Sequence, residues 1–295
     1  MLIDGKTCKP YEAFLADAGR PRYPWRVAIP TYRRAETLKK KTLRMLADST
    51  VPADRIDVFV ANEEERAAYE RTLPREWYSR IVVALPGLRH ARNFISRFYP
   101  QGQRVVSLDD DLTRFEMRVS DRKVNGVVPD LAALFDYGFA LADEIGTGVW
   151  GVYPCAGLSL RRNVRASLGF LIGFAYGFVS SRDGSHERHI DEKEDYELSI
   201  AQYLKFGKSC RIEYVTARTN CYTEPGGMQG KRTTGGEHAG AMYLVRKYPQ
   251  FVRPKWKNGV TKTGYAEIRL VDPKYPKGLC YAVPYADGTM QSKKC

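Results

Sequence analysis

Three observations predict an α/β fold of the Rossmann-like kind, a mostly parallel central sheet with helices on both faces. Short apolar runs recur at 26–30, 56–61, 81–85 and 105–108. Stretches with helical spacing separate several of them, and strands that alternate with helices favour a parallel sheet. Polar residues follow the runs, and ligands of such sheets bind at the carboxyl ends of the strands. The sequence therefore predicts a ligand site where 31, 62–63 and 109–111 meet.

The elements of the first half follow in order. The run 26–30 is a strand and is followed by the turn Thr31-Tyr32-Arg33-Arg34. From Ala35 onward, apolar residues at 35, 38, 45 and 46 fit one face of a helix. Strands at 56–61 and 81–85 come next, and Gly87 separates the latter from a helical stretch through Phe98. The run 105–108 is the fourth strand.

The second half is less regular. We expect a helix at 131–145, a strand at 150–153, and two glycine-interrupted strands within 157–180 that form a hairpin. The acidic run 191–197 opens a helix that Gly207 closes, because acidic residues are favoured at a helix N-terminus and glycine after its end. A strand near 211–216 precedes a loop that carries Gly226-Gly227 and Gly235-Gly236 around Lys231 and Arg232.

The charge of the chain is uneven. The net charge is +13 over 295 residues, and 228–295 hold 13 Lys and Arg against 4 Asp and Glu, so +9 of it lies there. A basic segment of this kind favours a polyanion partner, most simply nucleic acid, and the alternative is a merely basic surface. The length fits one domain or two small ones, and without an obvious linker we expect one.

Cysteines and apolar segments indicate the compartment. The six cysteines show no C-x-x-C spacing, so the sequence signals neither a zinc ribbon nor a redox pair. Met1 is followed by charged and polar residues without the apolar core of a signal peptide. The most apolar stretch, 168–179, is too short to span a bilayer. We therefore expect a cytoplasmic protein, in a host cytoplasm if it is viral, with no membrane partner.

Asp109, Asp110 and Asp111 directly follow the fourth strand. Adjacent carboxylates repel one another, and a divalent cation is the simplest compensation, since hard cations prefer oxygen ligands. The alternative is a solvated turn or helix start, where Asp is common. The residues by themselves leave both readings open.

Several motifs, taken in order, resemble one family. They are V-A-I-P-T-Y-R-R (27–34), A-R-N (91–93), D-D-D (109–111) and E-D-Y-E-L-S (194–199). Between about Val27 and Leu270 the chain resembles the GT-A glycosyltransferases. The segments 87–98, E-P-G-G-M-Q (224–229) and E-I-R-L (267–270) resemble the subgroup associated with base J synthesis and its phage relatives. That subgroup glycosylates hydroxymethylated pyrimidines in DNA.

The resemblance implies a nucleotide-sugar donor, a UDP-sugar, and a Mn²⁺ or Mg²⁺ ion. It implies that 1–110 bind the donor and that 111–295 bind the acceptor. Asp111 is the expected direct metal ligand, with Asp109 acting through water or on the donor, and His238 is the candidate for a C-terminal ligand. The expected donor-binding residues are Thr31, Arg33, Asn62, Glu63, Arg92, Asn93, Asp109 and Asp110. For Arg33, Arg92 and His238 the alternative is an ordinary structural or solvated side chain.

The same resemblance assigns the catalytic base to Asp195, with Glu194 as the fallback. The alternative is that both residues only stabilise the start of their helix. Lys231 and Arg232 are expected to hold either the donor diphosphate or the acceptor backbone.

The expected function is inverting, metal-dependent transfer of a sugar to a hydroxymethylated base of DNA. One rival is a GT-A enzyme that acts on a glycan or protein acceptor. The other is a non-catalytic nucleic-acid-binding module, which the retention of both acidic motifs argues against.

Overall fold

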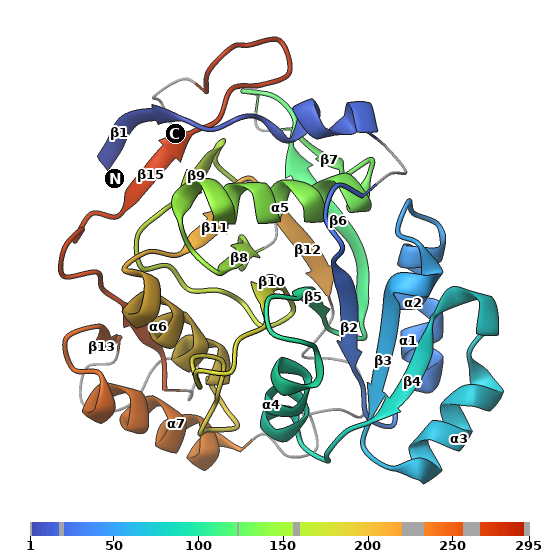
Figure 1. The fold of residues 1–295 in the computed structure, drawn as a ribbon. Helices are drawn as coiled ribbons and strands as arrows, with labels where there is room; N and C mark the ends of the chain where they lie inside the picture. Colours follow the sequence, from blue (N-terminus) through green and yellow to red (C-terminus); the bar gives the residue numbers. More distant parts are fainter. Residues whose placement is uncertain are drawn as a thin grey trace.

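The computed structural model describes residues 2–17, 21–122, 124–155, 160–219, 233–255 and 266–291. They form a large sheet with helices on both faces, and a smaller helical layer lies beside one half of it (Figure 1). The α/β class and the central sheet predicted from the sequence are therefore confirmed.

The central sheet has ten strands in the order β1-β15-β9-β11-β8-β10-β5-β2-β3-β4. The neighbours β5, β2, β3 and β4 are parallel, as predicted, whereas antiparallel pairings enter around β10 and β9. The bounds are β1 Leu2–Thr7, β2 Arg26–Pro30, β3 Ile56–Val60, β4 Arg80–Val83, β5 Arg104–Leu108, β8 Val149–Val152, β9 Asn163–Arg165, β10 Ala175–Val179, β11 Cys210–Ile212 and β15 Leu279–Ala282.

Two smaller sheets complete the strands. The first is antiparallel, in the order β12-β6-β7, with β6 at Leu112–Arg118, β7 at Asn125–Val127 and β12 at Val215–Thr219. The second pairs β13 (Val252–Pro254) with β14 (Ile268–Leu270).

The helices divide between the two faces of the central sheet. The α-helices are α1 Ala35–Lys40, α2 Thr42–Ala47, α3 Glu63–Thr72, α4 Leu88–Phe98, α5 Leu131–Ile145, α6 Glu194–Phe206 and α7 Thr234–Lys247, and the 3-10 helices are η1 Tyr11–Asp17, η2 Ala53–Arg55 and η3 Arg75–Trp77. One core joins α1, α2 and α5 to the sheet, and a second joins α4 and α6 to its other face. A third core packs α7 and the β13–β14 pair against α6.

Helix α5 lies close against the sheet because glycines make room for one large ring. Trp150 of β8 is buried, and a Cβ on Gly138 of α5 or on Gly177 of β10 would lie 2.4 Å or 2.1 Å from its indole. Contacts that short are sterically excluded, so both positions need glycine. The prediction of a helix over 131–145 matches α5 at both ends.

Three sequence-based predictions about the second half are wrong in detail. The two strands expected within 157–180 exist as β9 and β10, but β11 and β8 lie between them, so they form no hairpin. The strand expected near 211–216 is two strands, β11 and β12, in different sheets. Gly235 and Gly236 lie in the first turn of α7 rather than in a loop, where a Cβ on Gly236 would lie 2.6 Å from the carboxylate of Glu192.

The parallel strands bring two of the three predicted ligand segments, 31 and 109–111, to one cavity, whereas at the end of β3 it is Ala61 and not 62–63 that lines it. Thr31 follows β2, Ala61 follows β3 and Asp109 follows β5, and all three line one cavity. None of the helices in the described ranges is long and apolar enough to span a membrane.

Candidate functional site

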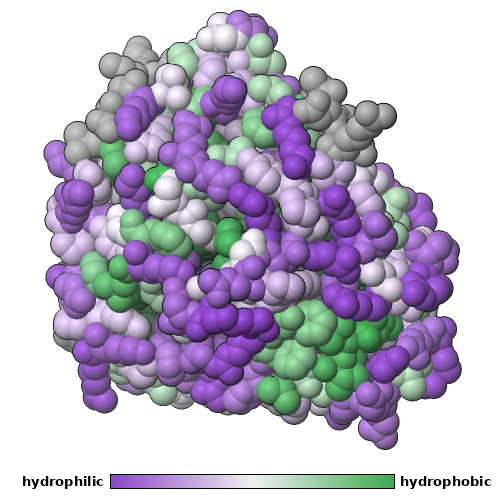
Figure 2. All heavy atoms as spheres, viewed as in Figure 1, coloured by the Kyte–Doolittle hydropathy of each residue, from purple (hydrophilic) through white to green (hydrophobic). Residues whose placement is uncertain are grey.

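A cavity of about 1010 Å³ lies at the carboxyl ends of the parallel strands. One side is formed by the ends of β2, β3 and β5 and by α4, and it carries the three aspartates. The other side is formed by residues within 165–174, the start of α6, residues of β11 and β14, and Lys255 after β13. A hollow among polar side chains is visible in the space-filling view (Figure 2). The size suits a substrate larger than a single sugar.

Asp110 is held toward β2 by a chain of hydrogen bonds. Thr31 Oγ1 donates to Asp110 Oδ2 over 2.7 Å and lies 2.7 Å from the hydroxyl of Tyr69, which accepts from the backbone N–H of Arg34 over 2.9 Å. Arg34 Nη1 lies 3.2 Å from Asp110 Oδ1. Burial raises the pKa of Asp110 to about 6, against the lowering effects of Thr31 and Arg34. Both oxygens are engaged, so this carboxylate positions the turn after β2.

Asp109 and Asp111 are the aspartates suited to a cation. Asp111 is buried, its Oδ1 accepts from Thr219 over 2.7 Å, and its Oδ2 accepts no hydrogen bond from the described residues. The Asp109 side chain is 30% exposed and lines the cavity. Burial raises the pKa of Asp109 to about 7 against the attraction of Arg92, and the neighbouring aspartates add to the rise. A cation in the cavity would relieve this crowding.

The donor set fits an ion that is completed by substrate. Within the described part of the chain, no group of three or more His, Cys, Asp or Glu side chains encloses a metal position. Mg²⁺ is commonly held by one or two carboxylates, with water and substrate phosphates as its other ligands. Asp111, whose Oδ2 accepts no hydrogen bond from the described residues and lies 3.8 Å from Arg34 Nη1, and Asp109, facing the cavity, meet that requirement.

Arg92 connects the aspartates to the start of α6. Its Nη2 lies 3.0 Å from Asp109 Oδ1, its Nη1 donates to the carbonyl of Gly173 over 2.8 Å, and its Nε lies 3.2 Å from Glu194 Oε1. The guanidinium is 3% exposed, so these charges interact in a weakly screened environment. A Cβ on residue 173 would lie 3.0 Å from Nη2, and glycine therefore allows this close packing.

Glu194 and Asp195 have different surroundings although they are adjacent. The second oxygen of Glu194 lies 2.8 Å from Arg188 Nε, so each of its oxygens faces an arginine. Among the residues that the structure describes, no arginine hydrogen-bonds to Asp195; its Oδ2 accepts from the backbone N–H of Gly173 at 3.3 Å and its Oδ1 from that of Tyr196 at 3.0 Å. Burial and then the neighbouring Glu194 raise the pKa of Asp195 to about 7, against the attraction of Arg92. Asp195 lines the cavity, and of the two acids it is the one whose carboxylate has no arginine contact among the described residues.

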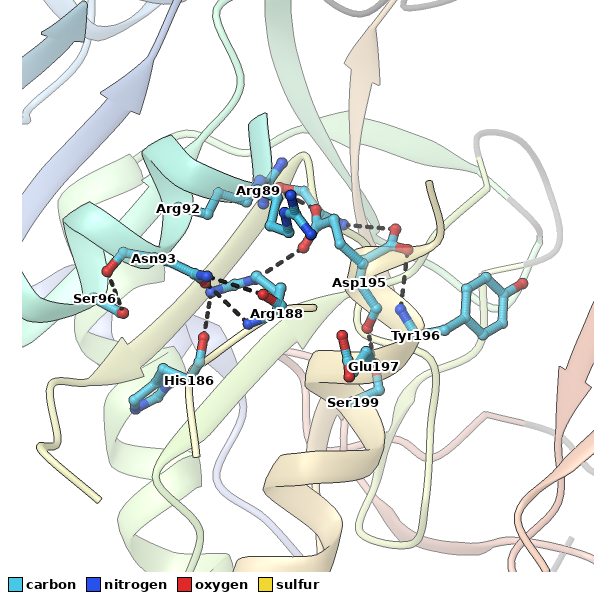
Figure 3. A network of polar contacts seen from close by, with 12 residues as sticks. Arg89, Arg92, Asn93, Ser96, His186, Arg188, Asp195, Tyr196, Glu197 and Ser199 are labelled. Atoms are coloured by element: carbon cyan, nitrogen blue, oxygen red, sulfur yellow. Dashed lines mark hydrogen bonds and ion pairs between the residues drawn. The ribbon is translucent and has the colours of Figure 1, made fainter. Parts of the chain in front are cut away.

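The first turn of α6 is anchored from several directions. Ser199 Oγ donates to the carbonyl of Asp195 over 2.7 Å and accepts from the N–H of Leu171 over 2.9 Å. Buried Glu197 accepts from the N–H of His189 over 2.7 Å and from Lys247 of α7 over 3.0 Å. Figure 3 shows the carboxylate of Asp195 accepting from the backbone N–H of Tyr196, and Ser199 contacting the backbone of Asp195, at the start of α6. These contacts fix the helix start that presents Asp195.

Five of the predicted site residues do not line this cavity: Arg33, Asn62, Glu63, Asn93 and His238. Their other contacts explain why. Arg33 has positive φ, is exposed, and lies over the ring of Tyr32. Asn62 caps α3 by accepting from the N–H of Glu65, and exposed Glu63 pairs with Arg66. Asn93 exchanges hydrogen bonds with the backbone of Arg188.

His238 lies on the exposed side of α7, in a separate surface depression with Met242 and Arg246. Its placement gives no support to the predicted metal role. Lys231 and Arg232 lie outside the described residues. The remaining predicted residues line the cavity together: Thr31, Arg92, Asp109, Asp110, Asp111, Glu194 and Asp195.

Two arginines that contact the acidic residues of the site, Arg34 and Arg188, were not predicted from the sequence. Arg33 has a left-handed backbone conformation, and the next residue, Arg34, points inward to Asp110. Because the two neighbours are the same residue type, the sequence does not show which of them enters the site. Arg188 lies in a segment without periodicity, and its role appears only through its contacts with Glu194 and Tyr176.

Comparison with known proteins gives a likeness to solved structures only. No model of a known protein family and no curated protein matches the sequence. S. aureus TarS 1–349 is similar at 15% identity and a TM-score of 0.44, over 75% of this chain and 65% of that one. The chain therefore spans slightly less than two thirds of that relative.

Two further structures cover more of their own length. The mannosyltransferase PcManGT from Pyrobaculum calidifontis, in complex with GDP-Man and Mn²⁺, has 13% identity and a TM-score of 0.42, over 81% of this chain and 69% of that one. Glucosyl-3-phosphoglycerate synthase from Mycobacterium tuberculosis, with Mn²⁺, UDP and glucosyl-3-phosphoglycerate, has 13% identity and a TM-score of 0.41, over 89% and 90%. The proposal that follows rests on the geometry of the cavity.

Proposed function

We propose that the chain is an inverting glycosyltransferase that uses a nucleotide-sugar donor, a UDP-sugar, and a divalent metal, and that its acceptor is a hydroxymethylated pyrimidine of DNA. One observation carries the proposal. A single cavity has Asp109 and Asp111 on one side and Asp195 on the other, and Arg92 joins the two sides. Transfer with inversion needs this separation, because leaving group and acceptor occupy opposite faces of the sugar.

The chain's residues have distinct tasks in the reaction. Asp109 and Asp111 would hold Mn²⁺ or Mg²⁺, and Thr31 and Arg34 keep the aspartate turn in place. The chemistry that the bound ion supplies is neutralisation of the charge on the departing diphosphate. Arg92, between Asp109 and Glu194, keeps the positive charge of the site close to that leaving group.

Asp195 accepts the proton of the acceptor hydroxyl. The hydroxyl oxygen forms a bond to the anomeric carbon while the bond from that carbon to the diphosphate oxygen breaks, and the diphosphate keeps the electron pair. A base with a pKa of about 7 is matched to this task near neutral pH. Glu194 is the poorer candidate, since Arg92 and Arg188 occupy its oxygens.

The DNA acceptor is supported by charge. The +9 balance of 228–295 favours a polyanion, and Lys255 and Arg269 of that segment line the cavity. A base within a duplex cannot reach Asp195, so the target nucleotide must be unpaired or turned out of the stack.

The test is direct transfer. The protein is incubated with DNA that contains hydroxymethylcytosine or hydroxymethyluracil, with Mn²⁺ and a panel of nucleotide sugars. The DNA is then digested to nucleosides for mass spectrometry. We expect a hexose or pentose mass on the modified base only, and none with unmodified DNA. Transfer to glycan or protein acceptors but never to DNA would refute the proposed acceptor.

A further inference from the structure

Five cations line the side of the cavity that includes the start of α6, and two of them have an acidic partner of their own. Lys193 pairs with Glu237 over 2.6 Å, and Lys255 lies 3.8 Å from Glu267. The three remaining cations that line this side are Arg165, Arg211 and Arg269. A single acid, Glu213, faces two of them. Arg165, Arg211 and Arg269 therefore form a locally cationic part of this side, which favours an anionic ligand.

Arg165 and Arg211 are directly opposite each other on antiparallel β9 and β11. Arg165 Nε lies 3.0 Å and Arg211 Nε 2.8 Å from the same oxygen of Glu213. Like charges in opposite positions of a strand pair are destabilising, and one carboxylate neutralises only one of them. This pairing therefore retains one positive charge within the cavity wall.

The structure makes room for Arg165 in particular. A Cβ on Gly169 would lie 2.6 Å from Arg165 Cδ, and one on Gly278 would lie 2.6 Å from its Nη1. Gly278 also has a φ of +76°, which favours glycine. Within the described residues, neither terminal nitrogen of Arg165 donates a hydrogen bond to a protein acceptor. These two donors are in place to form a forked contact with phosphate oxygens.

Arg269 contributes a third cation from another element. It stands opposite Arg253 in the β13–β14 pair, is exposed, and makes no ion pair with the described residues. Arg253 donates instead to backbone carbonyls, among them that of Val252 at 2.9 Å, and does not line the cavity. The two arginines therefore differ in their access to a ligand.

An aromatic pair lies beside these cations. The rings of Phe170 and Tyr196 stack at 4.0 Å between centroids and 23° between planes, and both residues line the cavity. Arg211 Nη1 donates to the carbonyl of Phe170 over 2.9 Å, and Tyr196 directly follows Asp195. Cations next to stacking aromatic rings are the combination that binds single-stranded nucleic acid.

We propose that Arg165, Arg211 and Arg269 bind a backbone phosphate of a single-stranded or flipped-out nucleotide, and that the Phe170–Tyr196 pair stacks on its base. This inference rests on the proposed function, because it places the acceptor base next to Asp195. A phosphate of the nucleotide-sugar donor has the same chemistry, and the experiment distinguishes the two sources.

The experiment measures binding apart from transfer. Fluorescence anisotropy gives the affinity for a short, labelled single-stranded oligonucleotide with one hydroxymethylated pyrimidine, and calorimetry gives the affinity for UDP with Mn²⁺. Arg165→Gln should weaken oligonucleotide binding by about 10- to 100-fold. The same change should lower the slope of log affinity against log salt by about 0.7 and leave UDP binding unchanged.

Three further variants make the result specific. Arg165→Lys keeps the charge without the forked donors and should lose less affinity than Arg165→Gln. Phe170→Leu, which keeps an apolar side chain, should weaken binding about 5- to 100-fold with the salt slope unchanged. Arg253→Gln is the matched control, since it removes the same charge from a position that does not line the cavity, and should retain most of the affinity. Melting temperatures establish that each variant is folded.

Two outcomes would overturn the inference. Equal losses of oligonucleotide affinity in Arg165→Gln and Arg253→Gln would mean that binding depends only on the overall charge of the protein. A loss of UDP affinity without a loss of oligonucleotide affinity would assign the arginines to the donor. Oligonucleotide binding that depends on Arg165 without any sugar transfer would instead leave this inference intact and refute the proposed function.

Discussion

Arg92 Nη2 lies 3.0 Å from Asp109 Oδ1, and through this contact α4 holds the carboxylate that faces the cavity. The same guanidinium reaches Glu194 at the start of α6, 3.2 Å away. The two acidic motifs, which are 85 residues apart in the sequence, therefore depend on one buried cation. The relative position of the metal-binding and proton-accepting groups is set by a side chain that belongs to neither motif.

Replacement of Arg92 by methionine should destabilise the fold. The change leaves Asp109 without its arginine partner and Glu194 with Arg188 alone, and loss of one member of a buried ion pair costs about 3–5 kcal/mol. Urea unfolding measures this free energy. The matched control is Arg97→Met on the same helix, because Arg97 is 59% exposed and its pair with Glu187 contributes about 0–1 kcal/mol. Similar losses in the two variants would contradict the role assigned to Arg92.

Asp111→Asn should abolish metal binding without loss of the fold. Asn still accepts the hydrogen bond from Thr219, but it removes the charge and the carboxylate oxygen that accepts no hydrogen bond from the described residues. Turnover should fall on the order of 10³, the equivalent of several kcal/mol of transition-state stabilisation. Mn²⁺ should raise the melting temperature of the wild type and not of the variant. Full wild-type activity in excess EDTA would be incompatible with the proposed metal.

The fold was largely predictable because its first half follows simple periodicity. The strands that begin at 26, 56, 80 and 104 alternate with helices. Because these strands are parallel, Thr31 and Asp109, which follow two of them, lie at the same edge of the sheet. The second half departs from this rule, since β10 and β9 enter the sheet antiparallel. Apolar runs of three to five residues do not encode which partner they pair with, so the hairpin prediction failed.

The candidate site was predictable where chemistry is concentrated in adjacent residues. The runs at 109–111 and 194–195 are conspicuous in the sequence, although the residues alone left a structural reading open and the resemblance was needed to assign them to a site. Side-chain direction was not predictable. Arg33 and Arg34 are identical residue types, and only the positive φ of Arg33 decides that Arg34 enters the site. The same holds for Arg165, whose environment depends on Gly278, 113 positions later.

The transfer rate should depend on pH through Asp195. Its pKa is raised from 3.8 to about 7, first by burial and next by Glu194, and only the ionised form accepts a proton. With metal and both substrates saturating, kcat should rise about tenfold per pH unit below 7 and level off above it. An ordinary aspartate would give a flat profile from pH 5 upward. A flat profile would therefore remove Asp195 from the role of base.

Asp195→Asn separates catalysis from support of the helix. Asparagine stabilises a helix start about as well as aspartate, and it can accept the same hydrogen bond from Gly173. It cannot take a proton, so kcat should fall on the order of 10²–10⁴ while donor and metal still bind.

The stability of this variant supplies the control. The folded-state pKa of Asp195 lies above its unfolded value of 3.8, so its ionisation opposes folding above about pH 7 and has no effect below about pH 4. Asp195→Asn should consequently melt at or above the wild-type temperature at pH 8, and this advantage should shrink as the pH falls. A variant that keeps near-normal turnover would show that Asp195 is not the base. Glu194→Gln would then be the variant to measure, since Glu194 is the other acid at the start of α6.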